Sequence, residues 1–317
     1  MGRVPRALTR AAFSSPAGPC VRSLSCANGQ LERCVACAII LQRFLPTTRE
    51  VTMKVYISAD IEGVCGVTHF DEATLSKEES RWAREQMTAE VAAACEGALQ
   101  AGAKEVWVKD AHDTGRNIMA SKLPEGVRLV RGWSRHPMMM MQELDATFDA
   151  AVMIGYHSRA SAAGNPLSHT MSGGIVHLLI NGQPSSEFLI NSYAAATQHV
   201  PVALVSGDQG LCDDVKQLNS HITTVAVKQG VGASTVNIHP ATATTRIKDG
   251  VFSALRGDLR ACQVPLPGHF TVEIKYRDHS QAYVGGFFPG ARQVEPTTIA
   301  FDCDEYFEVL RLLLFVL

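Results

Sequence analysis

The sequence predicts an α/β protein with a mainly parallel sheet covered by helices and a smaller, mixed α/β part toward the C-terminus. Short apolar runs rich in Val and Ile alternate with longer segments whose apolar residues recur at helical spacing, which is typical of βαβ units. In the second half, an Asn-Gly turn predicts a hairpin and breaks this pattern. A chain of 317 residues is long enough to bury a large core.

The elements of the first half follow from local patterns. A buried strand is expected at residues 54–59, because a Val-Tyr-Ile run favours extended backbone. A helix is expected at about 77–101, where apolar residues recur every four positions, and Gly102 would end it as a C-cap glycine. The other elements predicted here are strands at 105–109 and 127–131, a helix at 138–144 and a strand at 150–155. Four consecutive Met residues in the predicted helix are expected to fill the core.

The second half mixes hairpin and helical patterns. The turn at Asn181-Gly182 is expected to close a hairpin that begins with a strand at 175–180. The further elements predicted are a helix at 188–198, strands at 200–206 and 223–227, a helix at 240–255, strands at 270–276 and 297–302, and a closing helix from Asp304. We expect one domain at residues 53–317, with a soft subdomain boundary near 165–175.

Residues 1–52 differ from the rest of the chain. They carry seven Arg and two Glu, a net charge of +5, whereas the remainder carries 22 basic and 29 acidic residues, a net charge of −7. An Arg-rich, acid-poor segment resembles a mitochondrial transit peptide, and the other interpretation is an upstream extension with Met53 as the working start. Both interpretations place the segment outside the fold. We expect a cytoplasmic protein, or a mitochondrial one if the segment is a genuine transit peptide.

Charge, hydropathy and cysteine content exclude several classes of partner. An acidic body disfavours nucleic acid, since phosphate binding needs basic surfaces. The apolar runs at 35–41 and 310–317 are too short to span a bilayer, so no membrane partner is expected. The nine Cys residues form no disulfide pattern, which indicates a reducing compartment, and the lone CxxC at 34–37 is a weak signal for metal or redox chemistry.

Two carboxylates directly follow the first predicted strand. Asp60 and Glu62 are spaced i, i+2, so in an extended chain their side chains point to the same face. Two carboxylates this close repel each other and raise each other's pKa unless a cation lies between them. The pair therefore predicts a metal site at the carboxyl end of a strand, where α/β proteins place their ligands.

Two histidines follow other predicted strands. His112 comes after the strand at 105–109 and His157 after the strand at 150–155. Because carboxyl ends of parallel strands lie side by side, these groups are expected to converge with the carboxylate pair, and a mixed set of imidazoles and carboxylates suits zinc. Asp110 or Asp113 could orient the imidazole of His112.

Two further residues are candidates for the same site. His169 lies between two Gly-containing loops, where it could act as base, acid or nucleophile, or simply be exposed. Glu187 stands at the start of a predicted helix, where it is either a metal ligand or a carboxylate favoured by the helix dipole.

Five motifs give the chain a family resemblance. The motifs are Asp60-Ile-Glu62-Gly63, Lys109-Asp110-Ala-His112, Gly155-Tyr156-His157-Ser-Arg159-Ala, Ser168-His169-Thr-Met171 and Glu187-Phe-Leu-Ile-Asn191. With these motifs in this order, the chain resembles the zinc D-aminopeptidases of peptidase family M55, of the dipeptide-operon type, from Met53 to near the C-terminus.

The resemblance implies a specific active site. Asp60 would bridge two zinc ions per subunit, and His169 would be the catalytic histidine, described as a nucleophile. The remaining metal ligands would be Glu62, His112, His157 and Glu187. The family forms a ring-like homodecamer and removes N-terminal D-residues from short peptides, such as D-Ala-D-Ala. Ser186 departs from the Gly that relatives commonly carry before the glutamate.

Two other functions remain open from the residues themselves. Clustered Asp and His at strand ends also suit a dinuclear metallophosphatase-like hydrolase. A non-catalytic, flavodoxin-like binding module would use the same polar residues only structurally. Selectivity for D over L substrates rests on the resemblance alone, since spacing and composition carry no stereochemical information.

Overall fold

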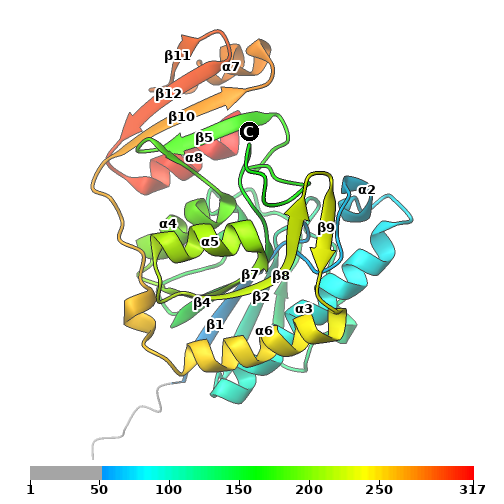
Figure 1. Cartoon of the computed structure of the whole chain (residues 1–317). Helices are drawn as coiled ribbons and strands as arrows, with labels where there is room; N and C mark the ends of the chain where they lie inside the picture. Colours follow the sequence, from blue (N-terminus) through cyan, green and yellow to red (C-terminus); the bar gives the residue numbers. More distant parts are fainter. Residues whose placement is uncertain (1–51) are drawn as a thin grey trace, which may run out of the picture. The chain divides into compact units, whose positions relative to one another are not determined.

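A seven-stranded sheet forms the centre of the computed structural model, which describes residues 52–317 (Figure 1). Its strand order is β3-β2-β1-β4-β7-β8-β9, and all neighbours are parallel except β8 and β9. The strands are β1 (Lys54–Ala59), β2 (Glu105–Asp110), β3 (Arg128–Val130), β4 (Ala150–Tyr156), β7 (Val202–Asp208), β8 (Thr223–Val231) and β9 (Ser234–Asn237). The predicted fold class is confirmed. The segment predicted to precede the fold lies, up to residue 51, outside the described residues.

A smaller antiparallel sheet lies beside α7 (His279–Gly285) and α8 (Tyr306–Val316) in the upper part of Figure 1. Its order is β11-β12-β10-β5-β6. The strands are β5 (Ile175–Ile180), β6 (Gln183–Pro184), β10 (Phe270–Tyr276), β11 (Arg292–Glu295) and β12 (Thr298–Cys303). The chain therefore leaves the large sheet after β4, returns to it at β7 and crosses again before β10. The predicted hairpin turn joins β5 to β6, with positive φ angles of 51° at Asn181 and 74° at Gly182.

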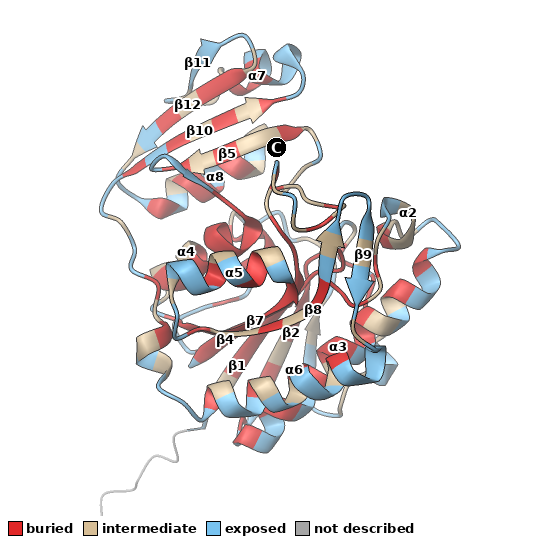
Figure 2. Ribbon diagram, in the orientation of Figure 1, coloured by how far each residue is buried: buried red, intermediate tan, exposed pale blue. Residues whose placement is uncertain are grey.

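Helices cover the large sheet on both faces, so its central strands are buried (Figure 2). Side chains alternate along β1: Val55 and Ile57 pack in the cluster that contains α3 and α6, whereas Tyr56 packs in the cluster that contains α4, α5 and α8. The longer helices are α3 (Ser80–Ala101), α4 (Glu187–Thr197), α5 (Gln209–Leu218), α6 (Pro240–Leu255) and α8 (Tyr306–Val316). Two short helices, α2 (Phe70–Ala73) and α7 (His279–Gly285), complete the set.

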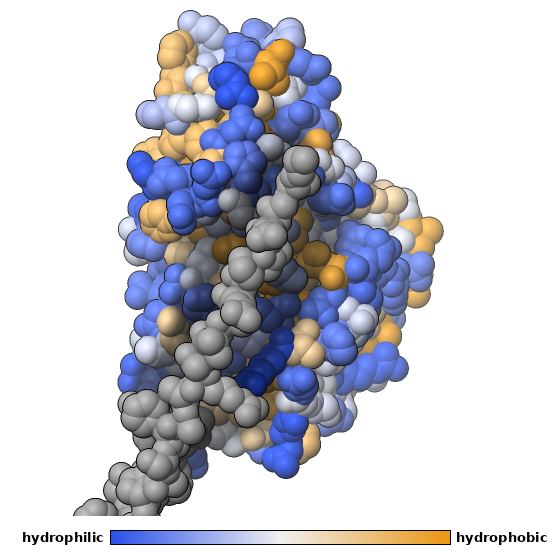
Figure 3. Space-filling model, turned by 90° about the vertical axis from the view of Figure 1, so that its left-hand side faces the viewer, coloured by the Kyte–Doolittle hydropathy of each residue, from blue (hydrophilic) through white to orange (hydrophobic). Residues whose placement is uncertain are grey.

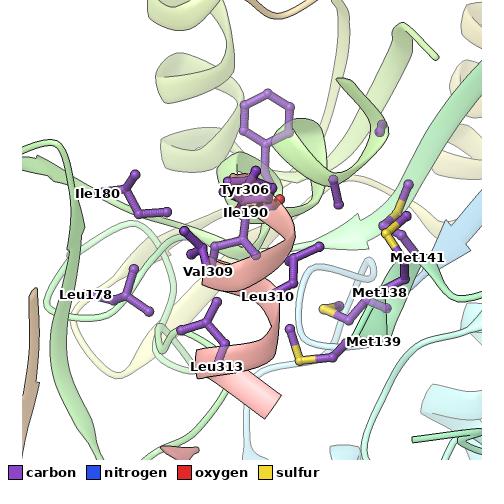
Figure 4. Close-up of a cluster of buried hydrophobic side chains, with 14 of the residues drawn as sticks. Met138, Met139, Met141, Leu178, Ile180, Ile190, Tyr306, Val309, Leu310 and Leu313 are labelled. Carbon is purple, nitrogen blue, oxygen red and sulfur yellow. Dashed lines mark hydrogen bonds between the residues drawn. The ribbon is translucent and has the colours of Figure 1, made fainter. Parts of the chain in front are cut away.

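The predicted helix at 138–144 is wrong. Only a single 3-10 turn forms, at Met139–Met141, because Met139 and Glu143 adopt positive φ angles of 43° and 70° that interrupt any longer helix. The four Met side chains are nevertheless buried, as predicted, in a cluster that includes Leu310 and Leu313 of α8 (Figure 4). Flexible Met side chains fill irregular space well, which suits a turn with such backbone angles.

Several elements were missed by the sequence analysis. Helix α5 was not predicted; Asp208, the last residue of β7, is its N-cap, and Oδ1 of Asp208 accepts a hydrogen bond from the backbone N–H of Leu211 at 2.9 Å. The other missed elements are short: α2, α7, β9 and β11. The five Cys residues within residues 52–317 are all free thiols, and no helix there is long and apolar enough to cross a membrane.

The surface is mostly hydrophilic on the face shown in Figure 3, with apolar side chains gathered mainly toward the upper part. The most exposed large apolar residues of the C-terminal part are Val284, Phe287 and Phe315.

The strand order reverses between β1 and β4. From β1 the chain proceeds outward through β2 and β3, whereas from β4 it proceeds the other way through β7 and β8. The loops after β1 and β4 therefore diverge to opposite sides and open a crevice at the carboxyl ends, the usual ligand site of an open α/β sheet. Gly63 lets the chain after β1 pack closely against the end of β4, because a Cβ at this position would overlap the carbonyl of Tyr156.

Candidate metal centre

The six residues singled out in the sequence come together at this crevice. Asp60 and Glu62 follow β1, His112 follows β2 and His157 follows β4. The other two come from the chain beyond β4: His169 lies in the loop before β5, and Glu187 is the first residue of α4. All except His169 are buried.

Asp60 stands between two histidines. Its Oδ1 lies 3.1 Å from Nδ1 of His112, and its Oδ2 lies 3.6 Å from Nε2 of His157. Glu62 joins the first histidine, with its Oε2 also 3.0 Å from Nδ1 of His112. The two oxygens of one carboxylate thus face two separate nitrogen donors.

Glu187 makes a similar link on the other side of the crevice. Its Oε2 lies 3.5 Å from Nε2 of His157, and its Oε1 lies 3.6 Å from Nε2 of His169. The two imidazole rings stack, with centroids 4.4 Å apart and planes at 23°. The backbone N–H of Met171 also donates to Oε1 of Glu187 at 2.7 Å, which fixes the carboxylate in place.

Backbone carbonyls set the orientation of the three imidazoles. Nε2 of His112 lies 2.7 Å from the carbonyl oxygen of Ala73, and Nδ1 of His157 and Nδ1 of His169 each lie 2.9 Å from a nearby carbonyl oxygen. Because a carbonyl can only accept, the nitrogen that faces it must carry the proton. The opposite nitrogen then offers a lone pair to the crevice, as metal-binding histidines do.

The charges of these buried groups shift one another's pKa values. Burial and then the charge of Glu62 raise the pKa of Asp60 well above its ordinary value. Burial opposes protonation of His157, but the charge of Glu187 outweighs it and raises the pKa of His157 to about 10. Burial would raise the pKa of Glu187, yet His157 lowers it to about 2. Protons on histidines thus neutralise the carboxylates, and a divalent cation would displace those protons.

The donor set fits a metal ion. Oε2 of Glu62 and Nε2 of His157 are buried without a hydrogen bond of acceptable geometry, although buried polar atoms normally have partners. Two groups of three residues each bring their donor atoms within 4.8 Å of one another, and the two groups share one histidine. These groups are Asp60, Glu62 and His157, and His157, His169 and Glu187. Mixed imidazole and carboxylate donors are typical of zinc sites.

A buried lysine, Lys228, stabilises the loop after β1 that carries Glu62. Nζ of Lys228, on β8, donates to the backbone carbonyls of Glu62 and Val67. Nδ2 of Asn165 donates to the same Glu62 carbonyl at 2.9 Å and to Asp208 at 3.2 Å. Burial lowers the pKa of Lys228 to about 8. These contacts could not be predicted from the sequence, because no local pattern links β8 to the loop after β1.

The proposed orienting role of Asp110 or Asp113 is wrong. Oδ2 of Asp110 accepts hydrogen bonds from the backbone N–H groups of Asn117 and Ile118, at 2.5 and 2.7 Å. It therefore anchors a loop, and the imidazole of His112 is oriented instead by a backbone carbonyl of α2.

The centre opens into a cavity of about 340 Å³. Four of the metal-ligand candidates, Asp60, Glu62, His112 and Glu187, line it together with His169, and apolar side chains form much of its wall. The apolar lining residues are Phe70, Ala73, Ala111, Trp133, Met140 and Met171. A space of this size suits a ligand of a few residues, with apolar contact around a charged base.

Comparison with known proteins identifies the family. The model of the peptidase family M55, described as D-aminopeptidase, matches residues 53–315. The chain belongs to the M55 family of D-aminopeptidases. It is thus an enzyme of the metallopeptidase class, as the motifs in the sequence predicted. Family membership favours this function over the phosphatase-like and non-catalytic interpretations.

A protein and a solved structure from Bacillus subtilis are similar to this M55 chain. A D-aminopeptidase of strain 168 is 31% identical over 264 residues, which is 83% of this chain and 96% of that protein. The solved structure of the Zn-dependent D-aminopeptidase DppA, described as a self-compartmentalizing protease, superposes with a TM-score of 0.79 at 30% identity. The superposition covers 83% of this chain and 96% of the solved chain.

Proposed function

We propose that this protein is a zinc-dependent aminopeptidase that removes N-terminal D-residues from short peptides such as D-Ala-D-Ala. The observation that carries the proposal is the pair of overlapping donor groups around Asp60 and His157, buried at the reversal of the strand order. The similar Bacillus protein is named as Zn-dependent, which supports zinc as the metal.

The proposed site holds two ions per subunit. Asp60 is the proposed bridge, because its oxygens face His112 and His157 separately. The other proposed ligands are Glu62, His112, His157 and Glu187. When bound, such a pair of ions polarises the scissile carbonyl and activates water.

His169 is the proposed catalytic residue. Nδ1 of His169 donates to a backbone carbonyl, so Nε2 carries a lone pair toward Glu187 and the cavity. This lone pair can attack the scissile carbonyl or take a proton from water. The side chain is only partly buried, and His157 stacks on one side of its ring, which restricts its rotation.

We also propose an oligomeric assembly and a cellular location for this protein. The Bacillus relative is described as self-compartmentalizing, and we propose that this chain also forms a homo-oligomer, specifically a ring-like decamer. Mass measurement of the intact assembly in solution tests this: ten copies are expected, and a monomer would contradict it. The free cysteines are consistent with a reducing compartment, for which we propose the cytoplasm.

One experiment separates the candidate functions. The full chain is purified, its metal content is measured by elemental analysis, and hydrolysis of D-Ala-D-Ala, L-Ala-L-Ala and p-nitrophenyl phosphate is compared. We expect two zinc ions per subunit and cleavage of the D-peptide alone, abolished by a chelator. Equal cleavage of the L-peptide would refute the stereochemical part, phosphate release would favour a phosphatase, and metal-free, inert protein would favour a binding module.

A further inference from the structure

The cavity above the metal centre contains one carboxylate without a partner. Among the described residues that line it, none is Lys or Arg, and three of the four acids belong to the proposed ligand set. The fourth is Asp113, whose side chain makes no hydrogen bond or ion pair within residues 52–317. The wall of the cavity therefore offers one uncommitted charge, and that charge is negative.

The backbone holds Asp113 in an unusual conformation. Its φ angle is 43°, in the left-handed region that Asp tolerates at a cost of about 1 kcal/mol or more. The indole N–H of Trp133 donates to the carbonyl of Asp113 at 2.6 Å, and the backbone N–H of Gly115 donates to His112 at 2.8 Å. These two hydrogen bonds hold the turn that contains Asp113. The exposed carboxylate of Asp113 therefore directly follows His112, a proposed metal ligand, along the chain.

Other contacts keep the wall around Asp113 rigid. Nζ of Lys109 lies 3.9 Å from the ring centroid of Trp133 and donates to the carbonyl of Gly132 at 2.8 Å. A cation above an indole face is attracted by the ring, so the lysine fixes the tryptophan that in turn fixes Asp113. The backbone of Asp113 is therefore held in place by the fold, at the edge of the cavity.

We propose that Asp113 binds the α-ammonium group of the peptide substrate and so determines that cleavage starts at a free N-terminus. The inference rests on the proposed function. An α-amine is protonated at neutral pH, with an ordinary pKa of about 7.7–8.0, and a carboxylate partner forms a charge-assisted hydrogen bond with it. A substrate carboxylate at the same place would be repelled. Binding the ammonium next to His112 would place the first peptide bond over the metal ligands.

A pair of zinc-binding probes isolates the contribution of the amine. D-Alanine hydroxamic acid and propionohydroxamic acid differ only in the α-amino group, and calorimetry on the zinc-loaded full chain measures their affinities without turnover. In Asp113→Asn, we expect the affinity for D-alanine hydroxamic acid to fall on the order of 10-fold. The affinity for propionohydroxamic acid should stay within about 2-fold of the wild-type value. Glu125→Gln removes an exposed charge that does not line the cavity, and serves as the matched control.

The outcomes separate this inference from the proposed function. The ratio of the affinity for D-alanine hydroxamic acid to that for propionohydroxamic acid decides the role of Asp113. If Asp113→Asn leaves this ratio unchanged, with zinc content intact, the role of Asp113 is overturned and amine binding by the metal is favoured. Equal losses for both probes would also overturn it, since they indicate a structural defect. Asp113→Glu is expected to restore part of the ratio. The proposed function fails separately, if the zinc-loaded wild type does not hydrolyse D-peptides.

Discussion

Nε2 of His112 lies 2.7 Å from the carbonyl oxygen of Ala73, the last residue of α2. Helix α2 is only four residues long, and a capping box between His69 and Glu72 closes its first turn. This short helix thus supplies the acceptor that fixes the tautomer of a proposed metal ligand.

The first prediction concerns which nitrogen binds the metal. His112 should bind zinc through Nδ1, whereas His157 should bind through Nε2, because the opposite nitrogen of each ring faces a backbone carbonyl. A crystal structure of the zinc-loaded protein should place these atoms about 2.0–2.1 Å from anomalous zinc peaks. Coordination by Nε2 of His112 would contradict the assigned tautomer.

The second prediction tests the bridging role of Asp60. Asp60→Asn removes the charge that faces both His112 and His157, so both ions should be lost and hydrolysis should fall below detection. Elemental analysis after dialysis should show well under one zinc ion per subunit. Asp145→Asn, an exposed change, should leave the metal content at the wild-type level. Two ions per subunit in Asp60→Asn would exclude the bridge.

The third prediction separates catalysis from metal binding. His169→Ala should lower kcat by about 10²–10⁴-fold, the usual contribution of a positioned acid or base, while zinc content stays the same. His221→Ala changes an exposed histidine elsewhere and should leave kcat unchanged. Loss of zinc in His169→Ala would instead make His169 a metal ligand. Mass spectrometry of quenched reactions can distinguish a nucleophile, which would carry an acyl group, from a base.

The fourth prediction concerns pH and the buried Glu90 on α3. Burial raises the pKa of Glu90 from 4.5 to about 7, and its Oε2 has no hydrogen-bond partner among the described residues. The folded state thus binds the proton more tightly than the unfolded state. Stability is therefore lost as pH rises from about 4.5 through 7, by on the order of 3 kcal/mol.

Glu90→Gln should remove this loss. The amide keeps an acceptor for the backbone N–H of Cys65, which donates to Oε1 of Glu90 at 3.0 Å. Urea unfolding of wild type and variant between pH 4.5 and 8 measures the difference in free energy of unfolding. The free energy of unfolding of Glu90→Gln should increase relative to that of wild type as pH rises. Glu85→Gln, exposed on the same helix, should show no such trend, and parallel curves for Glu90→Gln would refute the assignment.

The fifth prediction concerns Ser186, the N-cap residue of α4. Its Oγ accepts a hydrogen bond from the backbone N–H of Leu189 at 3.2 Å and caps α4 directly before Glu187. Ser186→Ala should cost about 1 kcal/mol, and Ser186→Gly only a few tenths, since glycine also caps helices well. Chemical denaturation measures both. Equal losses would show that the hydroxyl does not act as a cap.

Much of the fold could be predicted because periodicity and turn chemistry are local. The i, i+2 spacing of Asp60 and Glu62 at a strand end predicted their shared orientation. Parallel strands place their carboxyl ends at one edge, so His112 and His157 were expected nearby. The Met138–Leu144 segment was predicted wrongly because its apolar content fits a helix and an irregular buried turn equally well.

By itself, the sequence determined the alternation of strands and helices, the tight turn at Asn181-Gly182 and the order of the candidate ligands. Only the tertiary structure decided which carbonyl orients His112, that Lys228 clamps the loop of Glu62, and that Asp113 faces the cavity without a partner. The reason is physical. Local patterns depend on neighbours a few residues apart, whereas these contacts join residues separated by up to 166 positions and exist only once the strands have paired.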